Sequence, residues 1–244
     1  MARDEAVIFG LRAALAVAAR RPHAIRRAFH DKKRRRDVAP LLQATAAERR
    51  PYREVDDAEL ARITGTVHHE GVAVVCDPLP LLTPEALLAG LPDDGVCLAL
   101  DGVDNPHNHG AILRSAAWFG IGGVLLGTPA DTLNPAAIRV AQGGAEVTPI
   151  AAAADLPRAL TRYRDRGLAI VGADHNAQTA LFDRPLPRPL CLVLGNEATG
   201  LSPAVRKLCT ATVRIPGAAG VESLNVSVSA GILLAAAMSR AARG

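Results

Sequence analysis

From residue 96 onward, short apolar runs alternate with helix-like segments, and this alternation most limits the possible folds. The apolar runs lack the polar–apolar alternation of a half-exposed sheet and are typical of strands buried on both faces. Such strands separated by helices favour an α/β domain with a mostly parallel sheet covered on both sides. The expected strands are 96–100, 123–126, 146–150, 168–173, 190–194 and 211–215, and the expected helices are 109–119, 135–141, 156–166, 203–208 and 225–242.

The region before residue 77 has a different organisation and predicts a smaller α/β module. Its expected helices are 11–20, 38–49 and 57–63, and its expected strands are 24–29, 52–55 and 71–76. A proline-rich stretch follows and predicts a linker, with a short helix that ends near Gly90. The predicted domains are therefore residues 1–77, a linker over 78–94, and residues 95–244.

The first module carries a dense run of positive charge. Residues 20–36 contain nine cations and one acidic residue, Asp31, within a chain whose net charge is +4. A solvated loop is the alternative, but like charges at this density repel one another, which favours a surface that contacts a phosphate backbone. The residues expected to contact the phosphate backbone of a nucleic acid are Arg26, Arg27, Lys32, Lys33, Arg34, Arg35 and Arg36. Aromatic residues make up 3% of the chain, which disfavours a base-stacking platform.

Polar residues follow three of the expected strands, at the edge where an α/β sheet usually holds its ligand. The first loop leads into a helix with Asn108 and Gly110 as its expected cap and Arg114 in its first turns. The second places Glu197 after a strand, and the third places Ser223 and Asn225 before a helix. Taken singly, these residues are equally consistent with helix capping and, for Arg114, with an ordinary surface position.

Several common sites are disfavoured. The sequence has no dinucleotide fingerprint after the first strand of the domain, no phosphate-binding P-loop and no G-x-S-x-G nucleophile motif. His107 and His109 lack a convincing third ligand, so no metal is expected. The four cysteines have no ligand spacing and are expected to be buried, reduced thiols. Without a recognisable signal peptide or membrane span, a cytoplasmic protein is expected.

The loops together resemble the motifs of the SpoU (TrmH-like) RNA ribose 2′-O-methyltransferases of the SPOUT class. The first motif resembles Asn108-x-Gly110-Ala111-Ile112-x-Arg114. The second resembles Leu194-Gly195-Asn196-Glu197 with Gly200-Leu201. The third resembles Ile215-Pro216 with Ser223-Leu224-Asn225-Val226-Ser227. The first module is similar to the family's ribosomal-protein-like RNA-binding domain, with Gly10 and His69-Glu70-Gly71 as landmarks.

This resemblance implies a knotted, mostly parallel-sheet methyltransferase domain, a homodimer, and S-adenosyl-L-methionine as cofactor. It places the cofactor against residues of the second and third loops: Leu194, Gly195, Asn196, Gly200, Ile215 and Leu224. It assigns the central catalytic role to Arg114, with Asn108, Glu197, Ser223 and Asn225 shaping the site. Because a guanidinium does not normally lose its proton in a protein, we expect Arg114 to orient the ribose and bind the adjacent phosphate, with any role as base shared.

The resemblance favours structured ribosomal RNA as the substrate, because the separate first module is more typical of the ribosomal branch. Transfer RNA is the alternative within the same chemistry. A non-catalytic RNA-binding protein that retains the fold, and an α/β nucleotide-binding enzyme that acts on a small molecule, are alternatives of other classes.

Overall fold

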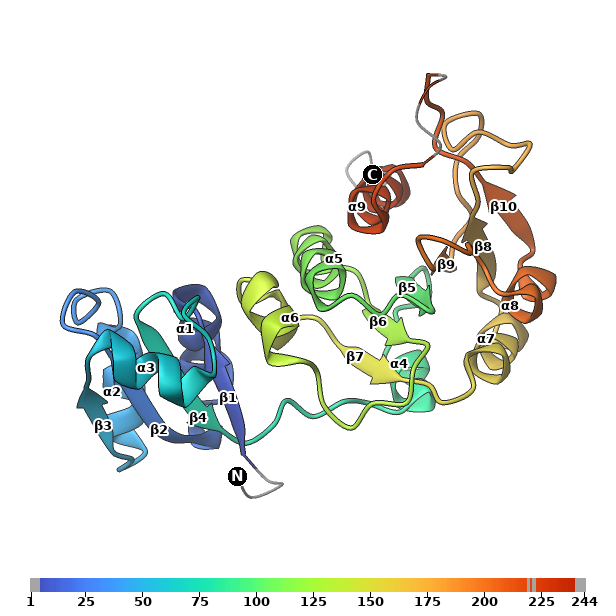
Figure 1. Ribbon diagram of the computed structural model, residues 1–244. Helices are drawn as coiled ribbons and strands as arrows, with labels where there is room; N and C mark the ends of the chain where they lie inside the picture. The colour runs from blue at the N-terminus through green and yellow to red at the C-terminus, as the bar shows by residue number, and fades with distance from the viewer. Residues whose placement is uncertain (1–4, 219, 221–222, 240–244) are drawn as a thin grey trace. The chain divides into compact units, whose positions relative to one another are not determined.

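A computed structural model describes residues 5–218, 220 and 223–239 of the chain, which divide into two compact units. The first unit comprises residues 1–80 and 132–147, and the second comprises residues 81–131 and 148–244. Figure 1 shows the elements of both units. The predicted domain boundaries differ from this division, because the predicted second domain contains 132–147 without interruption.

The first unit is built on a four-stranded mixed sheet with the order β1-β4-β2-β3. Strand β4 pairs antiparallel with both β1 and β2, and β2 pairs parallel with β3. Helices α1 and α2 pack against each other and against β4 and β2, respectively, whereas α3 packs on β1 and β4. The elements are β1 (Ala6–Phe9), α1 (Leu11–Arg20), β2 (Ile25–His30), α2 (Ala39–Ala47), β3 (Tyr52–Glu54), α3 (Asp57–Thr64) and β4 (Val72–Cys76).

Residues 132–147 add the helix α6 (Pro135–Val140) and a 3₁₀ turn (Gly144–Glu146) to the first unit. Arg21, at the end of α1, binds the Glu146 carboxylate through Nε at 2.7 Å and Nη2 at 3.0 Å. The Glu146 side chain is 1% exposed, so the pair is buried. Because a buried carboxylate needs its partner, this pair fixes the segment to α1. Residues 132–147 therefore belong to the first unit, although they lie in sequence between two strands of the second unit, at 123–126 and 150–152.

The second unit contains a six-stranded sheet in which all strand pairs are parallel, with the order β10-β8-β9-β5-β6-β7. The central strands β5 and β9 are buried along almost their whole length, as their apolar sequences require. The strands are β5 (Val96–Asp101), β6 (Gly123–Leu126), β7 (Ile150–Ala152), β8 (Ala169–Ala173), β9 (Leu190–Gly195) and β10 (Ala211–Val213).

Helices cover both faces of this sheet (Figure 1). On one face, α4, α7 and α8 supply apolar side chains to a core shared with β5 to β9. On the other face, α5 packs against α9 and β6, and α9 also packs on β9. The helices are α4 (Pro84–Ala89), α5 (Pro106–Phe119), α7 (Leu156–Asp165), α8 (Pro203–Leu208) and α9 (Val226–Met238). The predicted α/β class with a mostly parallel sheet is confirmed.

Three predicted elements need correction. The strand predicted at 146–150 is wrong, because Gly144–Glu146 forms a 3₁₀ turn and the strand is Ile150–Ala152. Strand β1 lies in an apolar stretch that had not been predicted as a strand. The last helix ends at Met238 rather than at 242, and residues 240–242 lie outside the described residues.

Candidate active site

The first motif lies on α5, which begins at Pro106 with Asn105 as its N-cap. The Asn105 side chain accepts a hydrogen bond from the His107 N–H at 2.9 Å. The prediction that Asn108 and Gly110 form the cap is therefore wrong, because the helix starts earlier. Asn108 is instead a buried residue of the first turn. Arg114 lies in the third turn, not the first turns, and is exposed. It has no side-chain partner within the described residues.

The second motif is a tight loop that follows β9 and is fastened to the end of β5. Asn196 and Gly200 form an antiparallel bridge that closes the loop. The Asn196 side chain donates to the Gly102 carbonyl at 2.7 Å and accepts from the Ala198 N–H at 2.8 Å. Asp101 accepts from the Ser202 N–H at 2.6 Å. Sequence reasoning missed Asp101 and Gly102, although their place at the end of a central strand was a usable signal.

Gly195 is required by this closed loop. A Cβ atom at this position would overlap the backbone of Gly200 and Leu201. Gly200 has a φ of 69°, a left-handed conformation that favours glycine, and nothing lies within 4 Å of its Cβ position. The two glycines therefore have different roles: Gly195 permits a close backbone approach, and Gly200 permits the turn.

The third motif is held by the segment that follows β8. The Arg214 guanidinium donates to the carbonyls of Ala177 at 3.0 Å and Gln178 at 2.6 Å, just before Ile215. Pro216, Gly217, Ser223 and Leu224 are exposed. Asn225 is the N-cap of α9 and accepts from the Ser227 N–H at 2.9 Å. The predicted capping role of Asn225 is confirmed.

Side chains from all three motifs meet at one point. Asn225 Nδ2 donates to Asn108 Oδ1 at 3.1 Å, and Asn108 Nδ2 donates to Glu197 Oε1. Asn108 is 9% exposed, whereas Glu197 is exposed. Leu194 and Gly195 are the last residues of β9, with Leu194 buried, and Asn196 begins the loop that carries Glu197. The structure thus brings together Asn108, Glu197 and Asn225, whereas Ser223 makes no side-chain hydrogen bond to another described residue.

Asp174, at the end of β8, supports the neighbouring helix. Its side chain forms an ion pair with Arg206 of α8 and accepts from the Asn176 N–H at 3.0 Å. Burial alone opposes the charge, but the hydrogen bond from Asn176 and the Arg206 guanidinium outweigh it and lower the pKa of the Asp174 carboxyl. Asp174 is therefore a charged structural group at neutral pH.

The histidines and cysteines supply no competing site in the described part of the chain. The His109 ring bonds the Val103 carbonyl, and His107 is exposed. No group of three or more potential metal-ligating side chains gathers within the described residues. All four cysteines are free, and Cys76, Cys97 and Cys191 are buried as predicted, whereas Cys209 is only half-buried. Burial raises the pKa of the Cys76 thiol to about 11, so it is protonated at neutral pH.

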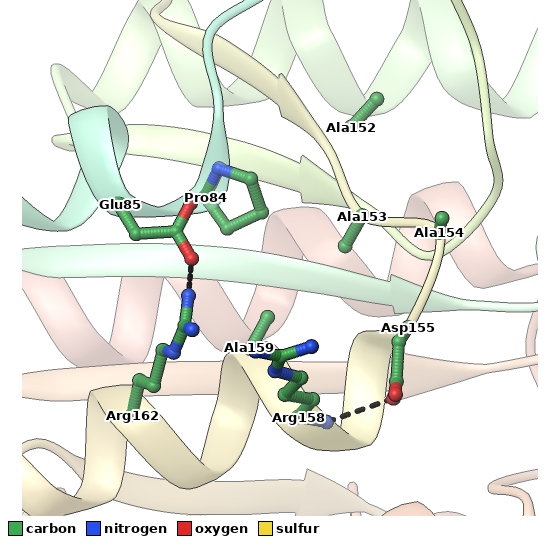
Figure 2. A pocket seen from close by; sticks show the side chains of 9 residues that line it. All are labelled: Pro84, Glu85, Ala152, Ala153, Ala154, Asp155, Arg158, Ala159 and Arg162. Carbon is green, nitrogen blue, oxygen red and sulfur yellow. Dashed lines mark hydrogen bonds and ion pairs between the residues drawn. The ribbon is translucent and has the colours of Figure 1, made fainter.

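A cavity of about 310 Å³ lies elsewhere on the second unit, between α4 and the start of α7. Figure 2 shows its alanine-rich floor and the ion pair between Glu85 and Arg162 at its side. It is beside β7, an edge strand, and its lining includes no residue of the three motifs. This cavity is therefore distinct from the candidate active site.

In the basic run of the first unit, some side chains form hydrogen bonds or ion pairs within the protein and others do not. Arg34 donates to the Glu70 carbonyl at 3.1 Å and pairs with Asp37 at 2.9 Å. Arg26 pairs with Asp77 and Arg27 with Glu5, each at 2.8 Å, and Arg35 lies 3.5 Å from Glu54. The exposed side chains of this run without a partner in the described residues are those of Arg20, Lys32, Lys33 and Arg36, and the last three are among the predicted RNA-binding residues.

Comparisons with known proteins assign this arrangement to a family. The model of the SpoU rRNA methylase family matches residues 95–235, and the model for RNA 2′-O ribose methyltransferase substrate binding matches residues 7–82. The chain belongs to the SpoU methylase family, as its motifs had predicted.

Relatives at higher and lower similarity agree with this assignment. An uncharacterized tRNA/rRNA methyltransferase of Mycobacterium avium is 42% identical over 78% of this chain, which spans 62% of that protein. The 23S rRNA (guanosine-2′-O-)-methyltransferase RlmB of Nitrosomonas europaea is 38% identical over 93% of this chain and 88% of its own length. The SpoU methyltransferase AviRb of Streptomyces viridochromogenes, solved with AdoMet, shares the fold, with a TM-score of 0.80 at 24% identity over 99% of this chain and 92% of that one.

No helix in the described residues is long and apolar enough to cross a membrane.

Proposed function

We propose that this chain is an S-adenosyl-L-methionine-dependent RNA methyltransferase that modifies a ribose 2′-oxygen, with ribosomal RNA as its substrate. The observation that carries the proposal is the hydrogen-bonded chain Asn225–Asn108–Glu197, which joins the three family motifs at one edge of the parallel sheet. Arg114 is exposed on the same helix as Asn108 and has no partner among the described side chains. Capping of α9 by Asn225 would not by itself require Asn225 to be hydrogen-bonded to Asn108, or Asn108 to Glu197.

The residues present fit the cofactor. The Asn196 side chain is used by the Gly102 carbonyl and by backbone N–H groups of its own loop, so the groups left to bind a ligand are mainly backbone groups. Added Cβ atoms at Gly200 and Gly217 would meet nothing within 4 Å, which leaves both loops open on one side. S-adenosyl-L-methionine would be held by residues of the second and third motifs: Leu194, Gly195, Gly200, Ile215 and Leu224. When bound, this cofactor supplies an electrophilic methyl group.

Arg114 is proposed to position the ribose. Its guanidinium stays protonated and offers a planar set of donors that matches a phosphate oxygen pair. A hydroxyl held in line with a methyl carbon gains most of its reactivity from this orientation. The exposed position of Arg114, without a carboxylate partner in the described part of the chain, leaves its donors available to an RNA phosphate.

The first unit is proposed to bind the RNA. Lys32, Lys33 and Arg36 are the cations available for phosphate contacts, and Arg34 holds the loop that carries them. In this proposal, three further arginines give up their ion pairs with protein carboxylates when they bind RNA phosphates. These are Arg26, Arg27 and Arg35. The match to RlmB over both units supports ribosomal RNA rather than transfer RNA.

We also propose that the chain acts as a homodimer in the cytoplasm and that its second unit contains the knot implied by the family. Trp118 of α5 is 85% exposed, and Leu224 and Val228 beside α9 are 47% and 51% exposed. Because α5 packs against α9, these apolar side chains belong to one pair of helices. A second copy of the chain would bury them.

Methyl transfer from labelled S-adenosyl-L-methionine to total RNA that lacks its own modification tests the proposal. We expect label in the 2′-O-methyl nucleosides of ribosomal RNA, followed by mapping of the site in cells with and without the gene. Label in transfer RNA would favour the other substrate. RNA binding without label transfer by the folded protein would indicate a non-catalytic RNA-binding protein.

A further inference from the structure

The orientation of two amide side chains can be deduced from the cap of α9. The Ser227 N–H points at Asn225, so the atom that receives it must be the Asn225 oxygen. The Asn225 NH₂ group therefore faces Asn108, which must present its own oxygen. The Asn108 NH₂ group is then directed at Glu197. The helix cap thus fixes the direction of every hydrogen bond up to the Glu197 carboxylate.

The result for Glu197 is a held but unneutralised carboxylate. Oε1 accepts the hydrogen bond from Asn108, and Oε2 has no partner among the described residues. No cation in the described part of the chain forms an ion pair with Glu197. One carboxylate oxygen is therefore open to a ligand, and the position of the carboxylate is set by the first motif.

The other acidic side chains near the motif loops are less suitable. Asp174 is paired with Arg206, and Asp101 accepts the Ser202 N–H. Asp104 is exposed in the loop before α5, but no described residue orients its side chain. Among the carboxylates of the described residues near these loops, Glu197 is therefore the one that is both directed by the motifs and available.

We propose that Glu197 is the proton acceptor for the ribose 2′-hydroxyl; this rests on the proposed function. The oxygen–carbon bond forms between the 2′-oxygen and the methyl group, and the bond from that carbon to the cofactor sulfur breaks with its electron pair left on sulfur. The hydroxyl proton moves to Glu197, which becomes neutral. The acidity of the hydroxyl rises as its oxygen gains the methyl group, so a carboxylate is a competent acceptor during the attack. Arg114 keeps its proton throughout.

The variant E197Q tests this assignment, because glutamine retains an oxygen acceptor for Asn108 but does not take up the proton. We expect its single-turnover rate of methyl transfer to fall by about 10²- to 10⁴-fold. Calorimetry is expected to give wild-type affinities for S-adenosyl-L-methionine and for RNA. The matched control is D104N, which neutralises the unoriented carboxylate and is expected to leave the rate within about threefold of wild type.

A double-mutant cycle with N108A separates proton acceptance from a merely structural role. If Asn108 acts by directing Glu197, N108A should slow the wild-type protein but have little further effect on E197Q. An E197Q rate near that of wild type, or full additivity of the two changes, would overturn the assignment. A wild-type protein that binds RNA but transfers no methyl group would instead reject the proposed function itself.

Discussion

The motif edge of the second unit, where Asn108, Glu197 and Asn225 meet, and the basic loop of the first unit, residues 31–38, differ in their chemistry. Both regions nevertheless contain polar residues with two separate roles. At the motif edge, Asn196, Asp101 and Asn225 use their polar atoms within the protein. In the basic loop, Asp31 accepts the Arg34 N–H at 2.7 Å, and Arg34 holds the Glu70 carbonyl. In both regions, some polar residues fix the backbone while neighbouring charged residues remain available. The comparison teaches that residue type alone does not distinguish the two roles.

Among the changes that test this comparison, the largest effect is expected for an available residue of the motif edge. R114A should lower methyl transfer by at least about 10²- to 10³-fold, because the guanidinium is proposed to orient the ribose and its phosphate. Cofactor binding, measured by calorimetry, should remain measurable. Near-normal turnover in this variant would show that Arg114 is an ordinary surface residue.

The next effect concerns a residue that fixes the same edge. G195A should weaken S-adenosyl-L-methionine binding by about tenfold or more, because the added Cβ would force the loop backbone at Gly200 and Leu201 to move. Isothermal calorimetry measures this change. The matched control is G90A, whose Cβ would lie at least 3.5 Å from its neighbours. Equal affinities of G195A and wild type for S-adenosyl-L-methionine would show that this loop does not bind the cofactor.

A smaller effect is expected for the available cations of the basic loop. The triple variant K32Q/K33Q/R36Q should weaken RNA binding by about tenfold. It should also reduce the slope of log affinity against log salt concentration by about two to three, because each phosphate contact that is lost means about one counterion fewer released on binding. Titrations at several salt concentrations measure both quantities. R164Q/R166Q/R184Q, with three exposed arginines of the second unit, is the charge-matched control. An unchanged slope in K32Q/K33Q/R36Q would show that these three side chains do not contact the phosphates of the RNA.

The smallest effect concerns the Asp174–Arg206 pair. R206Q should lower the unfolding free energy by about 1 kcal/mol near pH 7, since Arg206 is half-exposed. The pKa of Asp174 is lowered in the folded state, so the pair stabilises above the ordinary value of 3.8 and loses its effect as pH falls through the folded value. Thermal unfolding across acidic pH measures the difference between the two proteins. A difference that persists below both pKa values would contradict this explanation.

The sequence predicts five of the six strands of the parallel sheet, because buried parallel strands leave apolar runs. Two features were misassigned from local patterns. Asn105-Pro106 is a strong helix start, yet the motif pattern predicts the cap at Asn108 and Gly110. The strand predicted at 146–150 contained Glu146, whose burial depends on Arg21, 125 residues away. Long-range pairs of this kind leave no local signature.

The same limit applies to the basic run. Its charge predicts a polyanion surface, but the sequence does not show that Arg34 is engaged with the Glu70 carbonyl while Arg36 is not. The difference arises because Gly71 lets its backbone approach the Asp31 and Arg34 side chains closely. The assignment of individual cations to RNA remains a prediction.

The amide chain from Asn225 to Glu197 has a consequence for the order of folding. Its hydrogen bonds join residues 117 and 89 positions apart, whereas the bond from Arg34 N–H to Asp31 spans three. Contacts of large sequence separation are slow to form. We therefore expect the turn of the basic loop to become ordered before the catalytic groups are aligned. In a chain that is still folding, the proposed RNA-binding loop would therefore take its final form before the proposed catalytic groups meet.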